Sequence, residues 1–369
     1  MANFRLLQFL LFVHFTFLLI QSSSQAHLPQ PQNHVALFIF GDSLFDAGNN
    51  NYINTTTSFQ ANFEPYGETF FHHPTGRFSN GRLIPDFIAE HAKLPLLPPY
   101  KLPGNHQFTH GVNFASAGAG ALSQTYAGMV IDLKTQLVYL KNVKKMLEQK
   151  LGEAEADKFL SRAVYLLSIG SNDYLFPFVT NMTSQIYSRE EFVGMVIGNL
   201  TAVVEGIYKA GGRKFGFVNL TPLGCAPFMR LLNIANGGEC VEEATAFAKL
   251  HNIALSKVLR RLERRLHGFK YSYFDFYTTS SEILNNPSKY GFKEVNSACC
   301  GSGPFRGLNS CGGKRGVMEY ELCSNPREYV FFDFEHPTEM VYQQTAQLIW
   351  SGTSDVVSPY NLKTFFEQV

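Results

Sequence analysis

The sequence lacks an excess of charge of either sign. Its 369 residues include 31 Lys and Arg against 30 Asp and Glu, for a formal net charge of +1. It contains neither a Lys/Arg block nor a zinc-finger spacing, so nothing favours binding to nucleic acid or to anionic lipid. With 45% hydrophobic residues, the chain is expected to be globular and to act on a small molecule or a polymer.

Several common functional motifs are also missing. No serine lies in a G-x-S-x-G nucleophile elbow, and the spacings of the P-loop and of G-x-G-x-x-G do not occur. There is no C-x-x-C pair and no His partner at the spacing of a zinc site. These absences exclude an ordinary α/β-hydrolase, and we expect no cofactor and no metal site.

Long apolar runs are scarce, and one stands out at the N-terminus. Residues 6–20 are apolar, follow Arg5 and precede a small, polar stretch that ends at Ala26. The run is shorter than the roughly 20 residues that span a bilayer, so it predicts a secretory signal peptide over residues 1–26. The chain has no C-terminal retention signal. We therefore expect it to be secreted, with a mature chain over residues 27–369.

The cysteines are few and lie only in the second half of the chain. An even number in a secreted protein predicts disulfides. Cys299 and Cys300 are adjacent and do not easily bond to each other, so each is expected to pair with either Cys311 or Cys323. This leaves Cys225 to pair with Cys240. The six cysteines are Cys225, Cys240, Cys299, Cys300, Cys311 and Cys323.

Four N-x-[ST] glycosylation acceptors also suit a secreted chain. They are Asn54, Asn181, Asn199 and Asn219. Asn54 lies in a polar loop and is the favoured site. Asn219 closes a predicted buried strand, so we expect it to be unmodified.

Short apolar or β-branched runs alternate with helical patterns along the mature chain. The pattern predicts five strands, at 35–40, 112–115, 163–169, 214–220 and 271–276. Apolar residues three and four apart predict long helices between them, and a glycine follows most of these patterns. Strands that alternate with helices need crossovers, which make a mostly parallel sheet covered on both faces. Because the sequence has no linker and no repeat, we expect one three-layer α/β domain.

Polar residues follow three of these strands, at the sheet edge where such folds bind ligands. Ser43 follows the first strand beside Gly41, Gly118 follows the second, and Asn172 follows the third. Cleavage of an ester needs a nucleophile and donors for the oxyanion. Ser43 is the nucleophile candidate, and the backbone N–H groups of Ser43 and Gly118 with the Asn172 amide are the candidate donors. Taken alone, Ser43 and Asn172 fit helix caps equally well.

A base for this nucleophile is found near the C-terminus. His336 has an aspartate, Asp333, three residues before it, in a loop that precedes a predicted helix. Asp333 can hold one ring nitrogen and leave the other for Ser43, which is the logic of a catalytic triad. A lone Asp-x-x-His is otherwise typical of a surface turn.

Five sequence blocks resemble the plant-type GDSL esterase/lipase family of the SGNH hydrolase superfamily. They are FGDSLFDAGNN (40–50), PTGRFSNGR (74–82), GVNFAS (111–116), GSNDY (170–174) and the DFEHPTE segment (333–339). The resemblance implies a flavodoxin-like three-layer fold and a single hydrolase domain over residues 27–369. It also implies a secreted, apoplastic enzyme that acts on lipid, acyl-sugar or cell-wall esters. The nearest likeness is to members linked with pathogen defence.

The same resemblance assigns roles to residues. It implies that Ser43, Asp333 and His336 form a triad and that Gly118 and Asn172 complete the oxyanion hole. Two positions depart from the family: Ala117 replaces a usual Gly, and Phe332 replaces a usual Trp. We expect these to change the shape of the pocket rather than to remove activity. An acyltransferase that uses the same site, and a catalytically silent defence or binding protein, are the alternatives. The oligomeric state and the acyl and alcohol specificities are left open.

Overall fold

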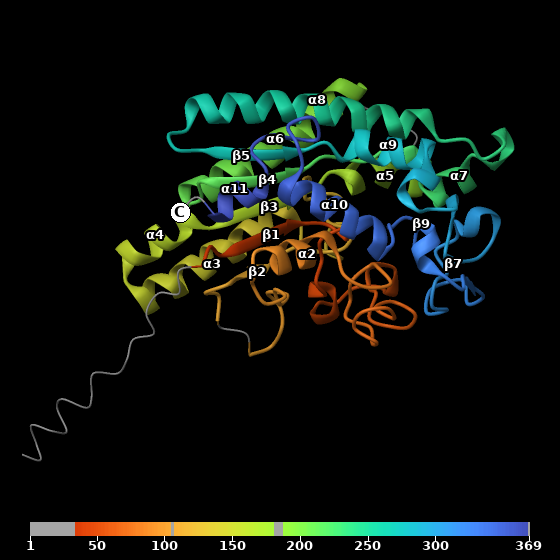
Figure 1. The fold of residues 1–369 in the computed structure, drawn as a ribbon, viewed down its shortest axis with the longest axis horizontal. Helices are drawn as coiled ribbons and strands as arrows, with labels where there is room; N and C mark the ends of the chain where they lie inside the picture. Colours follow the sequence, from red (N-terminus) through yellow and green to blue (C-terminus); the bar gives the residue numbers. More distant parts are fainter. Residues whose placement is uncertain (1–33, 105–106, 181–186, 368–369) are drawn as a thin grey trace, which may run out of the picture. The chain divides into compact units, whose positions relative to one another are not determined.

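A six-stranded sheet forms the centre of the unit Val35–Val369 in the computed structural model (Figure 1). The structure describes residues 34–104, 107–180 and 187–367. The strand order is β10-β5-β4-β3-β1-β2, and all neighbours are parallel except β10, which pairs antiparallel with β5. The strands are β1 (Leu37–Gly41), β2 (Gly111–Asn113), β3 (Val164–Ser168), β4 (Lys214–Val218), β5 (Lys270–Phe274) and β10 (Val357–Pro359).

The predicted mostly parallel α/β sheet is confirmed. Each of the five predicted strands has its ends within two residues of those observed. The sixth strand, β10, is missing from the prediction because it is three residues long and ends in Pro359. A proline is tolerated there because β10 is an edge strand.

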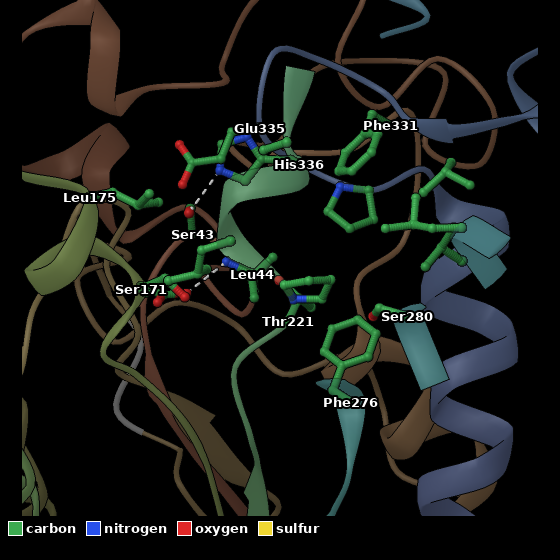
Figure 2. Close-up of a pocket in the computed structure, with 18 of the residues that line it drawn as sticks. Ser43, Leu44, Ser171, Leu175, Thr221, Phe276, Ser280, Phe331, Glu335 and His336 are labelled. Carbon is green, nitrogen blue, oxygen red and sulfur yellow. Dashed lines mark hydrogen bonds between the residues drawn. The ribbon is translucent and has the colours of Figure 1, made fainter. Parts of the chain in front are cut away.

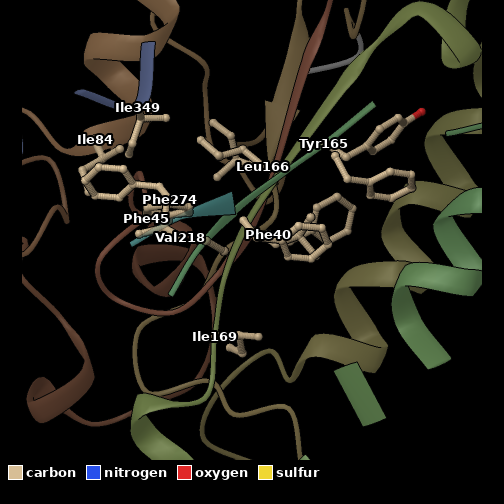
Figure 3. Close-up of a cluster of buried hydrophobic side chains, with 14 of the residues drawn as sticks. Phe40, Phe45, Ile84, Tyr165, Leu166, Ile169, Val218, Phe274 and Ile349 are labelled. Atoms are coloured by element: carbon tan, nitrogen blue, oxygen red, sulfur yellow. The ribbon is translucent and has the colours of Figure 1, made fainter. Parts of the chain in front are cut away.

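Helices cover both faces of the sheet. On one face α3, α6 and α8 pack side by side, and on the other α10 packs against α2 and α11. Figure 3 shows Phe40 and Tyr165 on one side of the strands and Ile84, Phe274 and Ile349 on the other. The helices are α2 (Ile84–His91), α3 (Leu133–Leu151), α6 (Arg189–Lys209), α8 (Glu242–Arg265), α10 (Glu339–Ser351) and α11 (Leu362–Glu367).

Local signals explain where these helices begin and end. The Asp132 carboxylate caps α3 by accepting the N–H of Thr135 at 2.9 Å, and Gly152 ends α3 with a positive φ of 84°. A reciprocal capping box between Ser188 and Glu191 starts α6. By length and composition α6 is apolar enough to cross a membrane, but its apolar stripe is buried against α3 and α8, as in a core helix.

Two small sheets and two of the three disulfides organise the region after β5, and the third disulfide lies between β4 and α8. Strands β6 (Glu294–Ala298) and β9 (Tyr329–Phe331) pair in parallel, and β7 (Cys300–Gly301) pairs antiparallel with β8 (Glu321–Leu322). The disulfides join Cys225 to Cys240, Cys299 to Cys323 and Cys300 to Cys311. The other α-helices in the described residues are α4 (Glu153–Arg162), α5 (Ser171–Thr180), α7 (Pro227–Leu232) and α9 (Phe276–Asn285).

Candidate active site

Ser43 lies on a tight turn at the carboxyl end of β1. The turn closes where the Asp42 carbonyl accepts the N–H groups of Phe45 and Asp46, at 3.1 and 3.0 Å. Gly41 before it has a φ of 150°, and a Cβ there would lie 2.3 Å from the Ser168 carbonyl oxygen of β3. Only glycine therefore lets β1 run beside β3 and then turn to present Ser43.

His336 and Asp333 reach Ser43 from the loop after β9. His336 Nε2 lies 2.8 Å from Ser43 Oγ (Figure 2), and His336 Nδ1 lies 2.8 and 2.9 Å from the two carboxylate oxygens of Asp333. With Nδ1 donating to the carboxylate, Nε2 is left to accept the Ser43 proton. The structure thus brings the three predicted residues into one hydrogen-bonded line.

Two residues that the sequence analysis did not single out hold Asp333. The Tyr66 hydroxyl donates to Asp333 Oδ2 at 2.7 Å. Arg315 Nη1 in turn donates to the Tyr66 oxygen at 3.1 Å and to the Cys311 carbonyl at 2.9 Å. Both residues lie in irregular loops far apart in the chain, so no periodic pattern or motif spacing marks them.

The pKa shifts of His336 and Asp333 fit the roles of a base and of the group that orients it. Burial opposes the charge of Asp333, but the positive charge and hydrogen bond of His336 and the hydrogen bond from Tyr66 lower its pKa to about 2. Burial also opposes the charge of His336, but Asp333 outweighs it and raises the pKa of His336 above its usual 6.5. Asp333 is therefore ionised at neutral pH, and His336 loses its proton at a higher pH than an unperturbed histidine does.

The candidate oxyanion donors converge beside Ser43. Gly118 has a φ of 81°, and a Cβ there would lie 2.5 Å from the Phe59 ring. Within the described residues, the backbone N–H groups of Ser43 and Gly118 donate to no protein group. Asn172, in the first turn of α5, donates one side-chain N–H to the Ala119 carbonyl at 3.0 Å, which leaves its second N–H.

Three buried aspartates fix the loops that carry these donors. The pKa of Asp42 is raised to about 7, and those of Asp46 and Asp173 to about 6, chiefly by burial. Asp46 accepts the backbone N–H groups of Gly48 and Ala117, and Asp173 accepts those of Ala121 and Leu122. The sequence signal for these aspartates was their position one to five residues after a strand, beside the candidate site residues.

Ala117 and Phe332, the two residues that depart from the family pattern, are both buried and packed in the protein interior. Ala117 is buried, and its carbonyl accepts the Asn50 amide at 3.0 Å. Phe332 is also buried and meets the Tyr66 ring edge-on, with ring centroids 5.4 Å apart. Phe332 therefore supports the residue that holds Asp333.

Two cavities meet at Ser43 and His336. A narrow one of about 60 Å³ is lined by apolar side chains such as Leu44, Phe276 and Phe331 (Figure 2). A wider one of about 570 Å³ has aromatic walls and also contains Gly118. Residues common to both are Ser43, Asn172, Leu175, Glu335 and His336. An ester bound at Ser43 therefore has separate space for its acyl and alcohol parts.

The predicted glycosylation acceptors differ in their exposure to solvent. Asn54 and Asn199 are exposed, whereas Asn219 is 2% exposed and its amide donates to Tyr273 and Asp275. Asn181 lies outside the described residues. In the part of the chain that the structure describes, no group of three or more His, Cys, Asp or Glu side chains is arranged to hold a metal ion.

Comparisons with known proteins give a consistent result. The family model for GDSL-like Lipase/Acylhydrolase matches residues 37–349. GDSL esterase/lipase 2 of Arabidopsis thaliana is 55% identical over 339 residues, which cover 91% of this chain and 90% of that protein. GDSL esterase/lipase 1 of the same plant is 54% identical, covering 91% of each chain. A GDSL lipase of Tanacetum cinerariifolium is 52% identical over 336 residues, covering 91% of this chain and 89% of that protein.

Proposed function

The chain belongs to the GDSL-like lipase/acylhydrolase family and is a carboxylic ester hydrolase, and we propose that it works through a Ser43–His336–Asp333 triad and an acyl-enzyme. The observation that carries this proposal is the continuous line of hydrogen bonds from Ser43 Oγ through the His336 ring to Asp333. Ester or lipid molecules are the substrate class.

In the proposed reaction, His336, Ser43 and the oxyanion donors each have one role. His336 Nε2 takes the proton of Ser43 Oγ as that oxygen attacks the carbonyl carbon of the ester. The Ser43 and Gly118 N–H groups and the Asn172 amide stabilise the oxyanion that forms. The alcohol leaves with the proton from His336, and water then releases the acid from Ser43 by the same route.

Asp333 acts as an anion and not as a second base. With a pKa of about 2 it does not take a proton from His336 near neutral pH. It fixes the tautomer of the imidazole and stabilises the imidazolium that forms during attack. The same attraction of Asp333 for the imidazolium raises the pKa of His336.

We also propose that the mature enzyme is one secreted domain over residues 27–369. The apolar segment at residues 6–20, the disulfides and the exposed acceptors Asn54 and Asn199 support export. The single contact unit Val35–Val369 supports one domain. Mass measurement of the protein from culture medium tests this, and an N-terminus at residue 27 is the expected result.

Hydrolysis of a p-nitrophenyl ester series by wild type and Ser43→Ala tests the proposed mechanism. Ser43→Ala is expected to lower kcat on the order of 10⁶-fold, as loss of a triad serine does in another hydrolase. Ser161→Ala, on α4, removes a hydroxyl outside the cavities and serves as the control. Residual activity within about tenfold of wild type would contradict the nucleophile, because a barrier change near 1.4 kcal/mol is too small for its loss. Transfer to an added alcohol in place of acid release would indicate an acyltransferase.

A further inference from the structure

Glu335 lies at the reaction centre but has no role in the triad. It lines both cavities, between Asp333 and His336 in the chain, and Figure 2 shows it beside Ser43 and His336. Its backbone N–H donates to Asp333, but in the described residues its carboxylate forms no hydrogen bond and no ion pair with any protein group. The site therefore contains an acidic group without a protein partner.

The Glu335 side chain is half-buried and borders both cavities. Burial raises the pKa of Glu335, His336 lowers it, and Asp333 raises it again, with a net shift upward. A half-buried carboxylate without a hydrogen-bonding partner attracts a nearby cation more strongly than a fully exposed one does. No Lys or Arg lines either cavity in the described structure, so a cationic substrate group would compete only with the protonated form of His336 for this carboxylate.

The wider cavity offers aromatic faces next to this acid. The rings of Phe59 and Tyr126 have centroids 4.7 Å apart, and those of Tyr126 and Phe176 have centroids 4.9 Å apart. Phe228 and Phe334 form a second pair on the cavity wall, at 5.7 Å. Aromatic faces attract quaternary ammonium groups, and grouped aromatic rings are a recurrent way to bind them.

We propose that Glu335 is a specificity-determining residue that selects esters whose alcohol part carries a positive charge, with the cationic group held in the wider cavity. The inference rests on the proposed function, since it assigns the alcohol side of the same site. The narrow cavity, with its apolar lining and volume of about 60 Å³, receives a short acyl group. The charge of Glu335 also disfavours esters with an anionic alcohol part.

A pair of esters with the same shape and different charge tests this proposal. Acetylcholine and 3,3-dimethylbutyl acetate differ in replacing the quaternary nitrogen with carbon. For wild type we expect kcat/KM to favour the choline ester by at least about tenfold, since burial strengthens ion pairing and cation–π attraction. In Glu335→Gln the preference should fall to within about threefold, mainly through KM for the choline ester. Glu153→Gln, at an exposed position that begins α4, is the matched control and should keep the wild-type preference.

Each outcome separates the inference from the proposed function. Hydrolysis of both esters by wild type at equal efficiency overturns the inference and leaves the esterase intact, whereas hydrolysis of neither, nor of any p-nitrophenyl ester, overturns the proposed function. An equal loss on both esters in Glu335→Gln would assign Glu335 to the chemistry and overturn selectivity. If that variant does not fold, tetramethylammonium inhibition of wild type decides. Competitive inhibition that is at least about tenfold stronger than by neutral tert-butanol supports the proposal, and inhibition no stronger than by tert-butanol overturns it.

Discussion

The two halves of the candidate site are built on different parts of the molecule. Ser43, Gly118 and Asn172 follow β1, β2 and β3, neighbouring strands of the central sheet. Asp333 and His336 follow β9, which belongs to a separate two-stranded sheet in the disulfide-bonded region. The nucleophile and oxyanion half therefore depends on the main core, while the base half depends on loops.

The forces that hold the two halves differ accordingly. The residues of β1 and β3 are buried along their whole length, so hydrophobic packing fixes the strands of the first half, and buried aspartates hold the loops that follow them. The second half depends on a polar chain, in which Arg315 contacts the Cys311 carbonyl and Tyr66, and Tyr66 contacts Asp333. Substitutions can therefore disturb the base without disturbing the nucleophile.

Among the substitutions that separate the two halves, the largest effect is expected at Asp333, which orients the proposed base. Asp333→Asn should lower kcat by roughly 10⁴-fold with the fold intact, because it permits the wrong imidazole tautomer; that figure is for the triad aspartate of another hydrolase. Steady-state kinetics and circular dichroism check this. Nearly full activity would mean that another group orients His336.

Asn172→Ala tests the nucleophile and oxyanion half, and a smaller effect on kcat is expected. It should lower kcat by roughly 10²- to 10³-fold with little change in KM, since the donor acts once charge develops on the oxyanion. Ala117→Gly in the neighbouring loop is the control and should be close to neutral. A change in KM alone would make Asn172 a substrate-positioning or capping residue instead.

Removal of one disulfide should weaken the base half selectively. Cys300→Ser with Cys311→Ser opens the loop that leads to Arg315, and is expected to lower the free energy of unfolding by about 3 kcal/mol. Denaturant unfolding followed by fluorescence measures this loss. Activity should disappear at a lower denaturant concentration than the far-UV signal of the helices. Coincident loss of both would show that the halves unfold together.

Loss of the hydrogen bond between Tyr66 and Asp333 is expected to lower kcat by a smaller factor. Tyr66→Phe keeps the buried ring and removes the hydroxyl that donates to Asp333 at 2.7 Å. We expect kcat to fall by about tenfold, near the 1.5–3 kcal/mol reported for a hydrogen bond to a charged group. KM should be unchanged, because Tyr66 holds Asp333 and does not line either cavity. A rise in KM with constant kcat would contradict this positioning role.

The pH dependence of kcat/KM tests the comparison through the smallest expected effect. In the proposed mechanism the neutral form of His336 is the active base, so kcat/KM should rise with pH, with a midpoint above 6.5 because Asp333 raises the pKa of His336. In Asp333→Asn that attraction is lost and burial lowers the pKa, so the midpoint should move to a lower pH. A profile that is flat down to pH 4 would remove histidine from the mechanism.

The same contrast explains what could be predicted from the sequence. The sheet half was accessible because hydrophobic runs mark strands, and parallel strands end at a common edge, which brought Ser43, Gly118 and Asn172 together. Strand β6 was not predicted because only one of its residues is fully buried, so no apolar run marks it, and β9 was not predicted because it has only three residues. Tyr66 and Arg315 act through contacts between distant loops, which leave no periodic signal.

Labelling with a fluorophosphonate, followed by peptide mass spectrometry, tests the central claim most directly. If the sheet delivers Ser43 to a base held by the disulfide-bonded region, one label per chain should be found on Ser43. Labelling should be slowed strongly in His336→Gln, because the base is absent while Ser43 stays in place. A label on another serine, or equally fast labelling of Ser43 in His336→Gln, would contradict the assembly of the site from these two halves.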